Sequence, residues 1–231
     1  MDHTSRHYES ELQELKEAIL FIGGTAEEMI ASAMKALVTR DSDLGRKVIE
    51  SDRTVDGAEL DVDHLCLNLL ALRQPAASDL RFIATALKMV TDLERIGDLA
   101  VNIAERALEL NQEPPLKPYI DIPRMSTAVA GMLHLALDAF VNRNAELARA
   151  VLAADDEVDK LNVQLFRELL TYMIEEPKNV SRAMRITFIA KYLERIGDHA
   201  TNIAQMVIFM CEGRDVRHPR LKRNIGTGGA T

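Results

Sequence analysis

The chain has 231 residues, of which 28% are charged and 47% are hydrophobic, a balance that is typical of a folded globular protein and argues against disorder throughout. Its formal net charge of −8 argues against a nucleic-acid backbone as the main partner, because phosphate binding requires clustered Lys and Arg side chains. Residues 1–15 lack the basic start and the apolar stretch of a signal peptide, and no segment approaches membrane-spanning length, so we expect a cytoplasmic protein. The two cysteines, Cys66 and Cys211, belong to no metal-ligand spacing and are expected to be buried thiols.

Prolines divide the chain into stretches that are free to form long helices, because proline breaks the interior of a helix. The seven prolines are Pro75, Pro114, Pro115, Pro118, Pro123, Pro177 and Pro219. We predict an all-α protein with helices at residues 8–40, 42–73, 76–111, 124–143, 145–175 and 178–213. The basic, Gly-rich stretch that follows is expected to be disordered.

Hydrophobic periodicity supports the second and third of these helices. In both, spacings of four and three residues alternate, which is the pattern of a heptad seam. The seam of the third segment consists of Phe82, Ala86, Met89, Leu93, Ile96, Ala100, Ile103, Ala107 and Leu110. The seam of the second consists of Leu44, Val48, Ser51, Val55, Ala58, Val62, Leu65, Leu69 and Leu72. Helices with such seams are expected to pack side by side.

An internal repeat organises the chain into two halves. A shift of 103 positions lays Ala36–Asp56 on Ala139–Asp159, and a shift of 100 lays Leu93–Asp98 on Leu193–Asp198. Two helical units of this length predict two tandem, pseudo-symmetric three-helix bundles, because the period is too long for a solenoid. The predicted domains are a first bundle at 1–111, a linker at 112–123, a second bundle at 124–213 and a tail at 214–231.

Four acidic pairs recur in matching places of the two halves. Residues four apart share one helix face, and two carboxylates there repel each other by a few tenths of a kcal/mol unless a cation intervenes. The pairs are Asp52 with Asp56, Glu94 with Asp98, Asp155 with Asp159, and Glu194 with Asp198. An oxygen-only ligand set suits hard cations and lacks the His and Cys that zinc prefers. We therefore predict metal sites at these pairs, with iron, manganese or magnesium as the expected ions.

The alternative for any single pair is an ordinary solvated helix face. Gly97 and Gly197 lie between the acids of a pair, and a glycine inside a helix costs about 1 kcal/mol against alanine. Each glycine therefore needs close helix packing or access for a ligand as its reason. In the second half, Asn162 and Phe166 stand where the first half has acids, which predicts weaker cation binding there. His199 is expected to be an ordinary surface side chain.

A repeated motif resembles the signature of a known family. Glu-Arg-Ile-Gly-Asp at 94–98 and 194–198, followed by Asn-Ile-Ala at 102–104 and 202–204, is similar to the signature of the PhoU family, whose members are two tandem three-helix bundles. The stretch Pro75–Arg81 also matches the first-repeat turn of that family. The resemblance covers nearly the whole chain. It implies that the four acidic pairs, which match the family's acidic motif, can bind multinuclear metal clusters.

The resemblance also implies a function. The protein is expected to be a cytoplasmic adaptor that acts when phosphate is plentiful. It would restrain the phosphate-specific ABC transporter through its ATPase and hold the sensor histidine kinase of the phosphate two-component system in its inhibitory state. The result would be indirect repression of the Pho regulon. A homodimer that meets the membrane only through these partners is expected.

Two other functions are open. A carboxylate-bridged metalloenzyme of the helical-bundle type requires inward-facing acids and Glu-x-x-His motifs, and only Asp61 and His64 approach that spacing. A metal-free helical scaffold would instead bind a partner through its acidic face. The sequence contains neither a Gly-rich phosphate loop nor a nucleophile elbow, so we predict that the protein is not an enzyme.

Overall fold

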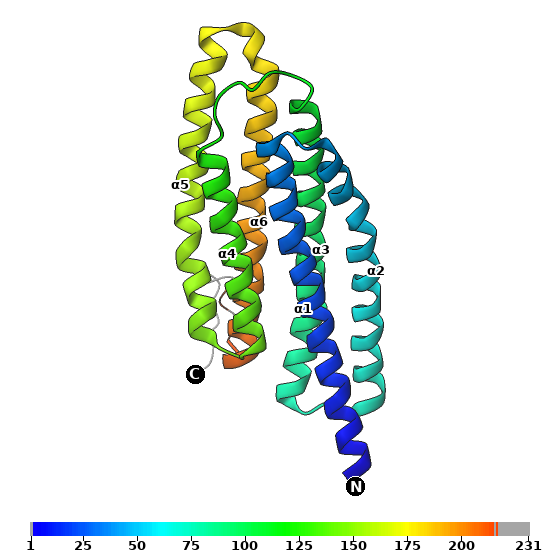
Figure 1. Ribbon diagram of the computed structural model, residues 1–231. Coiled ribbons are helices and arrows are strands. Elements are labelled where there is room, and N and C mark those ends of the chain that lie inside the picture. The colour runs from blue at the N-terminus through cyan, green and yellow to red at the C-terminus, as the bar shows by residue number, and fades with distance from the viewer. Residues whose placement is uncertain (1, 215, 217–231) are drawn as a thin grey trace, which may run out of the picture.

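Six long α-helices make up the computed structural model, which describes residues 2–214 and 216 (Figure 1). This part of the chain contains no β-strand. The helices are α1 (Asp2–Thr39), α2 (Ser42–Arg73), α3 (Ala77–Leu110), α4 (Asp121–Val141), α5 (Ala145–Glu175) and α6 (Val180–Glu212), with a short 3-10 helix, η1 (Pro177–Asn179), before α6.

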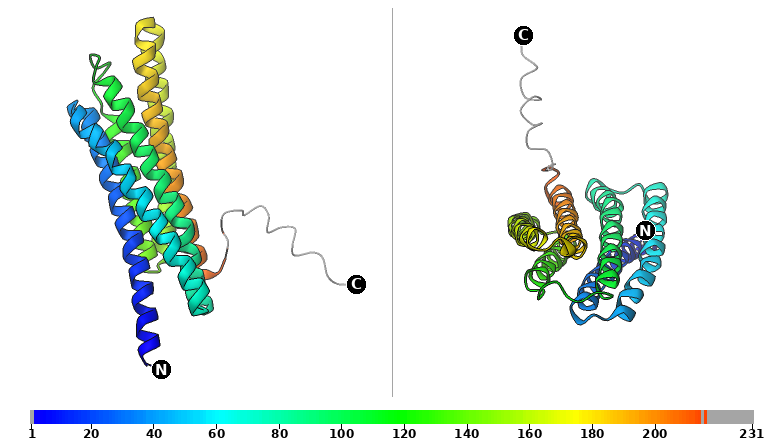
Figure 2. Two further views of the ribbon diagram at one scale, coloured as in Figure 1. Left: turned by 90° about the vertical axis from the view of Figure 1, so that its right-hand side faces the viewer. Right: turned by 90° about the horizontal axis from the view of Figure 1, so that it is seen from above.

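The helices form two three-helix bundles that lie side by side. The first bundle consists of α1, α2 and α3, and the second of α4, α5 and α6. Seen end-on, the two bundles lie beside each other (Figure 2). The main contact between the bundles is made by α3 and α6, and α1 also packs on α4. The predicted fold of two tandem bundles is confirmed.

The helix boundaries differ from the prediction in three places. The first helix, α1, begins at Asp2 and not at residue 8. The start of α4 is Asp121, because Pro123 is tolerated in a first turn, where backbone N–H groups have no helical partner to lose. The last predicted helix is divided, since η1 precedes α6. Of the predicted tail at 214–231, all but residues 214 and 216 lie outside the described part of the chain.

Burial confirms the predicted α3 seam and corrects the α2 seam. All nine α3 positions are at most 4% exposed. On α2, however, Leu72 is 73% exposed, and Cys66 is fully buried whereas Leu65 is only half-buried. Among the described helices, α2 packs only on α1 and α3, while α3 packs on three helices. The outer helix therefore buries a narrower stripe.

The same turn joins the first two helices of each bundle. Arg40 and Arg143 both adopt positive φ, at 59° and 48°. The next residues, Asp41 and Asn144, cap α2 and α5: each side-chain oxygen accepts a hydrogen bond from a first-turn backbone N–H, at 3.0 and 2.9 Å. Such caps satisfy donors that the start of a helix leaves without partners. The repeat thus extends to the backbone conformation of the turn.

Close contacts between the bundles involve both small and aromatic residues. Phe82 of α3 stacks on Phe140 of α4 with ring centroids 5.1 Å apart, and the Arg143 guanidinium lies 5.2 Å from the centre of the Phe82 ring. Where α1 meets α4, a Cβ added to Gly23 would lie only 2.5 Å from a methyl carbon of Leu137. The helices approach here as closely as a residue without a side chain allows.

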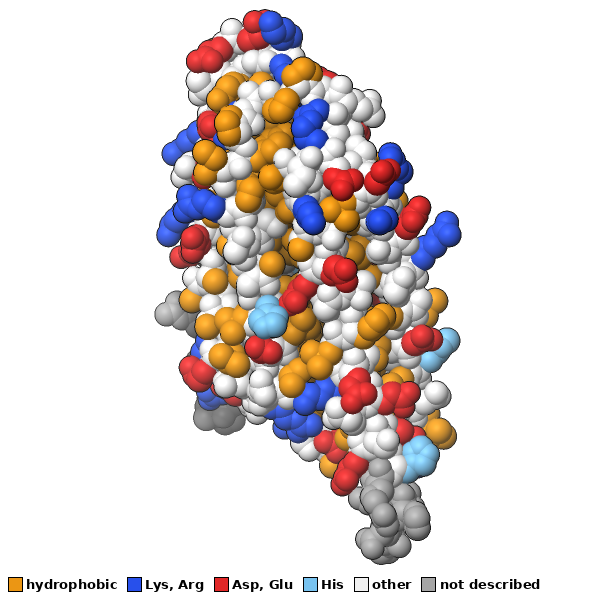
Figure 3. Space-filling view, viewed as in Figure 1, with side chains coloured by type: hydrophobic (Ala, Val, Ile, Leu, Met, Phe, Trp, Pro, Cys, Tyr) orange, Lys and Arg blue, Asp and Glu red, His pale blue; other side chains and the backbone are white. Residues whose placement is uncertain are grey.

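The surface carries side chains of both charges (Figure 3), and the described helices are too polar to span a membrane. Acidic and basic side chains are interspersed over the face in Figure 3, with hydrophobic side chains between them. None of the described helices combines the length and the apolar character needed to cross a membrane.

Candidate metal site: two acidic clusters

Six acidic side chains of α2 and α3 form what we call the first acidic cluster. Its members are Asp52, Asp56, Glu59, Asp63, Glu94 and Asp98. Burial, followed by the charges of Asp56 and Asp98, raises the pKa of Asp52. Burial and then Asp98 raise the pKa of Glu94, and burial and then Asp63 raise the pKa of Glu59. The carboxylates of the two helices are therefore close enough to disfavour one another's charge.

One basic side chain partly compensates the first acidic cluster. Nη1 of Arg95 donates to Oδ2 of Asp98 at 2.8 Å, and its Nε lies 3.3 Å from Oε2 of Glu94. The second contact is an ion pair without hydrogen-bond geometry, because the buried Glu94 Oε2 forms no hydrogen bond with any described residue. Buried polar atoms nearly always have a hydrogen-bond partner, so this oxygen is an exception that needs a reason.

The second acidic cluster repeats this arrangement between α5 and α6. Its members are Asp155, Asp159, Glu194 and Asp198. Burial, followed by Asp159 and Asp198, raises the pKa of Asp155, and burial followed by Glu194 raises the pKa of Asp198. Nζ of Lys191 donates to both carboxylate oxygens of Glu194, at 2.7 and 2.6 Å. The fold thus brings the predicted residues together as two groups of four, one in each bundle.

The two clusters differ in the number of carboxylates. Asn162 and Phe166 occupy the places that Glu59 and Asp63 hold in the first bundle. Phe166 is 49% exposed, so its ring is not part of the core. Since fewer carboxylates bind a hard cation less tightly, weaker binding by the second cluster stays our prediction.

The glycine between the acids of Glu94–Asp98 and of Glu194–Asp198 is buried where two helices meet. A Cβ added to Gly97 would lie 3.4 Å from a methyl carbon of Val55, which is an ordinary packing distance. At Gly197 it would lie 3.6 Å from Oδ1 of Asp155. Close helix packing therefore does not by itself require a glycine at either position, and Gly197 lies beside a carboxylate of the second acidic cluster.

The donor chemistry of both clusters fits a hard cation, but the side chains are not arranged around one. In residues 2–214 and 216, no group of three or more His, Cys, Asp or Glu side chains is positioned to hold a metal ion. Arg95 and Lys191 instead pair with the carboxylates. A cation would have to displace these two side chains, both of which are more than half exposed. Metal binding stays a prediction.

The expectation that His199 is an ordinary surface side chain is wrong. Its Nδ1 lies 2.7 Å from Oδ1 of Asp92 across the α3–α6 contact, and the His199 side chain is only 18% exposed. Asn202 donates to the same carboxylate oxygen at 3.2 Å. In the repeat, Leu99 of α3 corresponds to His199, and Tyr192 of α6 corresponds to Asp92. This polar contact between the bundles therefore occurs once.

The two cysteines differ in burial. Cys66 is fully buried, as predicted, and burial raises the pKa of its thiol to about 12. Cys211 is half-buried, so the prediction of a fully buried thiol is wrong there, although burial also raises its pKa. Neither thiol has the lowered pKa that a reactive cysteine requires.

Comparison with known proteins identifies the family. The model of the PhoU domain matches the chain twice, at residues 19–107 and 122–207. A Pseudomonas putida protein named a phosphate-specific transport system accessory protein PhoU homolog is 42% identical over 96% of this chain and 87% of its own length. An Aquifex aeolicus protein of the same name is 44% identical over 92% of this chain and 96% of its own.

Solved structures agree with this assignment. The crystal structure of PhoU from Pseudomonas aeruginosa has a TM-score of 0.86 at 41% identity and covers 90% of this chain and 100% of that one. The phosphate transport system regulatory protein PhoU from Streptococcus pneumoniae has a TM-score of 0.83 at 27% identity and covers 90% of this chain and 99% of that one. With both halves matched and each carrying its acidic cluster at the same helix junction, the chain belongs to the PhoU family.

Proposed function

We propose that this protein is a negative regulator of phosphate uptake and of the phosphate-starvation response, acting as a cytoplasmic adaptor. Its partners would be the ATPase of the phosphate-specific ABC transporter and the sensor histidine kinase of the phosphate two-component system. The observation that carries the proposal is the similarity, over nearly the whole chain, to proteins named as accessory to phosphate-specific transport. That these relatives are named accessory proteins also supports a role other than catalysis.

A cell that lacks the chain tests this function. Phosphate uptake and a reporter of the phosphate-starvation response are measured in phosphate-rich medium, with and without the gene on a plasmid. Loss of the gene should raise both signals, and the wild-type gene should restore them. Unchanged uptake and reporter signals in the deleted strain would contradict the proposal.

We propose further that the two acidic clusters bind hard cations and that occupancy is an input to the signal. Burial and then repulsion between neighbouring carboxylates raise the pKa values of Asp52, Glu94 and Asp155, and a bound cation would relieve that repulsion, which supports this proposal. The buried Glu94 Oε2 without a hydrogen bond is an oxygen that a cation could use. A divalent cation would bring more positive charge to a cluster than the single side chain of Arg95 or Lys191 does.

Metal content of untagged protein, measured by mass spectrometry after titration with iron, manganese or magnesium, tests the first acidic cluster. The cluster variant carries Asp52→Ala, Asp56→Ala, Glu94→Ala and Asp98→Ala. The control variant removes the same charge from exposed positions through Glu14→Ala, Glu50→Ala, Asp61→Ala and Glu175→Ala. Stoichiometric metal in the wild type and the control, but not in the cluster variant, is expected. Equal loss in both variants would indicate adsorption to surface charge.

The second candidate function is a metal-free scaffold that binds partners through its acidic faces. The ion pairs of Arg95 and Lys191 favour it, because they already place a positive charge at each cluster. Absence of metal from the wild type in the same experiment would support this candidate. Under it, the cell-based result would be unchanged, so the regulatory proposal and the metal proposal fail separately.

A further inference from the structure

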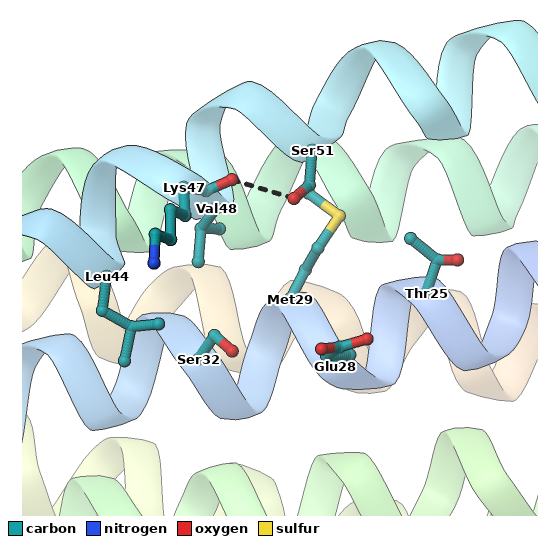
Figure 4. Close-up of a pocket in the computed structure, with 8 residues that line it drawn as sticks. All are labelled: Thr25, Glu28, Met29, Ser32, Leu44, Lys47, Val48 and Ser51. Atoms are coloured by element: carbon teal, nitrogen blue, oxygen red, sulfur yellow. Dashed lines mark hydrogen bonds between the residues drawn. The ribbon is translucent and has the colours of Figure 1, made fainter.

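A groove of about 260 Å³ opens between α1 and α2 (Figure 4). Its lining residues are Thr25, Glu28, Met29, Ser32, Leu44, Lys47, Val48 and Ser51. Met29 and Val48 are buried and form an apolar floor, while the polar residues are half-buried or exposed at the rim. Pockets for drug-sized ligands measure roughly 300–1,000 Å³, so an occupant of this groove would be smaller.

The positive and the negative side chain of the groove lie toward opposite ends of it. Lys47 lies beside Leu44 at one end, and Thr25 and Glu28 lie toward the other end (Figure 4). Neither Lys47 nor Glu28 forms an ion pair with a described residue. The groove therefore presents a positive group and a negative group that are not used by the fold.

The hydroxyl groups of Thr25 and Ser51 are available to a ligand only as hydrogen-bond acceptors, because their protons are already donated to the backbone. The Thr25 hydroxyl donates to the backbone carbonyl of Phe21 at 2.8 Å, and the Ser51 hydroxyl donates to that of Lys47 at 2.8 Å. Each hydroxyl has a single proton, so both oxygens are left with lone pairs to offer a ligand. Together with the Glu28 carboxylate, they favour a ligand group that carries several N–H donors.

Comparison of the two bundles shows which groove-lining residues helix packing requires. In the second bundle the apolar lining is kept, with Met132, Leu147 and Val151 in the places of Met29, Leu44 and Val48. Every polar lining residue is lost, however. Thr25, Glu28, Ser32, Lys47 and Ser51 are replaced by Ala128, Gly131, Leu135, Ala150 and Ala154.

The two sets occupy equivalent environments. Position by position, each polar residue of the first bundle has the same class of burial as its apolar counterpart in the second. Since α4 and α5 pack correctly with alanine, glycine and leucine at these positions, helix packing does not explain the polar residues of the first bundle. Five such replacements around one groove indicate that the polar residues serve a role of the groove other than helix packing.

We propose that the α1–α2 groove binds a small zwitterion, which is a molecule with an ammonium group and an acidic group, such as a free amino acid. The ammonium group would lie against Glu28 and Thr25, and the acidic group would lie against Lys47. The apolar floor would cover the carbon atoms between them. A divalent cation alone is disfavoured because Lys47 lines the same space.

Titration of the ¹⁵N-labelled full chain, followed by two-dimensional NMR, tests the proposal. The probes are the common L-amino acids and phosphoethanolamine, with acetate and methylamine as half-probes that carry one charge each. At least one zwitterion should shift the amide signals of residues 25–32 and 44–51 with a dissociation constant of about 1 mM or lower. Both half-probes should bind at least about tenfold more weakly. Equal binding of the half-probes, or no groove shifts with any zwitterion, would overturn the proposal.

Three variants test the residues. Lys47→Met and Glu28→Gln each remove one charge, and Ser32→Leu installs the residue that the second bundle tolerates at the same half-buried position. Each should weaken zwitterion binding at least about tenfold. The control variant, Glu50→Gln with Arg53→Gln, changes exposed charges on α2 outside the groove and should bind as the wild type does. If the charge variants bind normally while their spectra show a folded protein, the site is elsewhere and the proposal is wrong.

Discussion

Replacing Gly23 with alanine tests the contact between α1 and α4. The added methyl group would lie 2.5 and 2.8 Å from the two methyl carbons of Leu137, whereas carbon atoms in contact are about 3.5–4.0 Å apart. Leu137 is only 4% exposed, so its methyl groups have little room to move. Overpacking costs about 1–3 kcal/mol, and alanine gains about 1 kcal/mol over glycine in a helix. The net change should lie between zero and about 2 kcal/mol of destabilisation.

Gly24→Ala is the matched control, because it lies on the same helix and an added Cβ would meet no atom within 4 Å. It should stabilise the protein by up to about 1 kcal/mol. Urea unfolding followed by far-ultraviolet circular dichroism measures both variants, which should differ by about 1–3 kcal/mol. In the Gly23→Ala background, Leu137→Ala should cost less than in the wild type. If Gly23→Ala gains as much stability as Gly24→Ala, the contact between α1 and α4 does not exist in solution.

Three further predictions concern the fold and the clusters. Asp52→Asn should raise the free energy of unfolding at neutral pH, because the raised pKa of Asp52 means that its charge destabilises the folded state. The gain should vanish below about pH 4, where Asp52 is protonated in both states; a gain that is independent of pH in urea unfolding would contradict this. Asp41→Ala and Asn144→Ala should each cost about 1 kcal/mol in the same assay through loss of a helix cap, and a change near zero would show that the caps are not formed. His199→Ala should cost about 1–2 kcal/mol, because Asp92 loses the shorter of its two contacts with α6 and keeps only the hydrogen bond from Asn202. Exposed His64→Ala should change stability by less than about 0.5 kcal/mol; equal effects would contradict the contact between the bundles.

How well the sequence predicts a helix face depends on where the helix lies. The α3 seam is predicted correctly at every position because α3 packs on three helices, so almost all of its apolar periodicity points inward. On the outer helix α2, Leu60, Leu67 and Leu72 are 59%, 56% and 73% exposed. These exposed leucines obscure the period, and a seam drawn through apolar positions then includes Leu72 wrongly.

The acidic pairs are predictable from the sequence because each pair lies on one helix, where a spacing of four residues fixes a common face. The combination of pairs into clusters depends on the register of α2 against α3, which no local pattern contains. Arg95 could have been recognised from its spacing of three residues to Asp98. The contact of Asp92 with His199 could not, because it joins residues 107 positions apart and has no counterpart in the repeat.

The duplication also bears on why the acidic pairs are present in both bundles. Along the exposed side of α2 and α5, equivalent residues have diverged freely: Arg53 corresponds to Asp156, with reversed charge, and Gly57 corresponds to Lys160. Between these variable positions, Asp52 and Asp56 correspond to identical aspartates. The raised pKa of Asp52 means that its charge opposes folding, so stability does not account for an acid at this position. A solvated face would tolerate the same exchange here as at its neighbours, so the shared aspartates agree with the proposed interaction with a cation or with a basic partner.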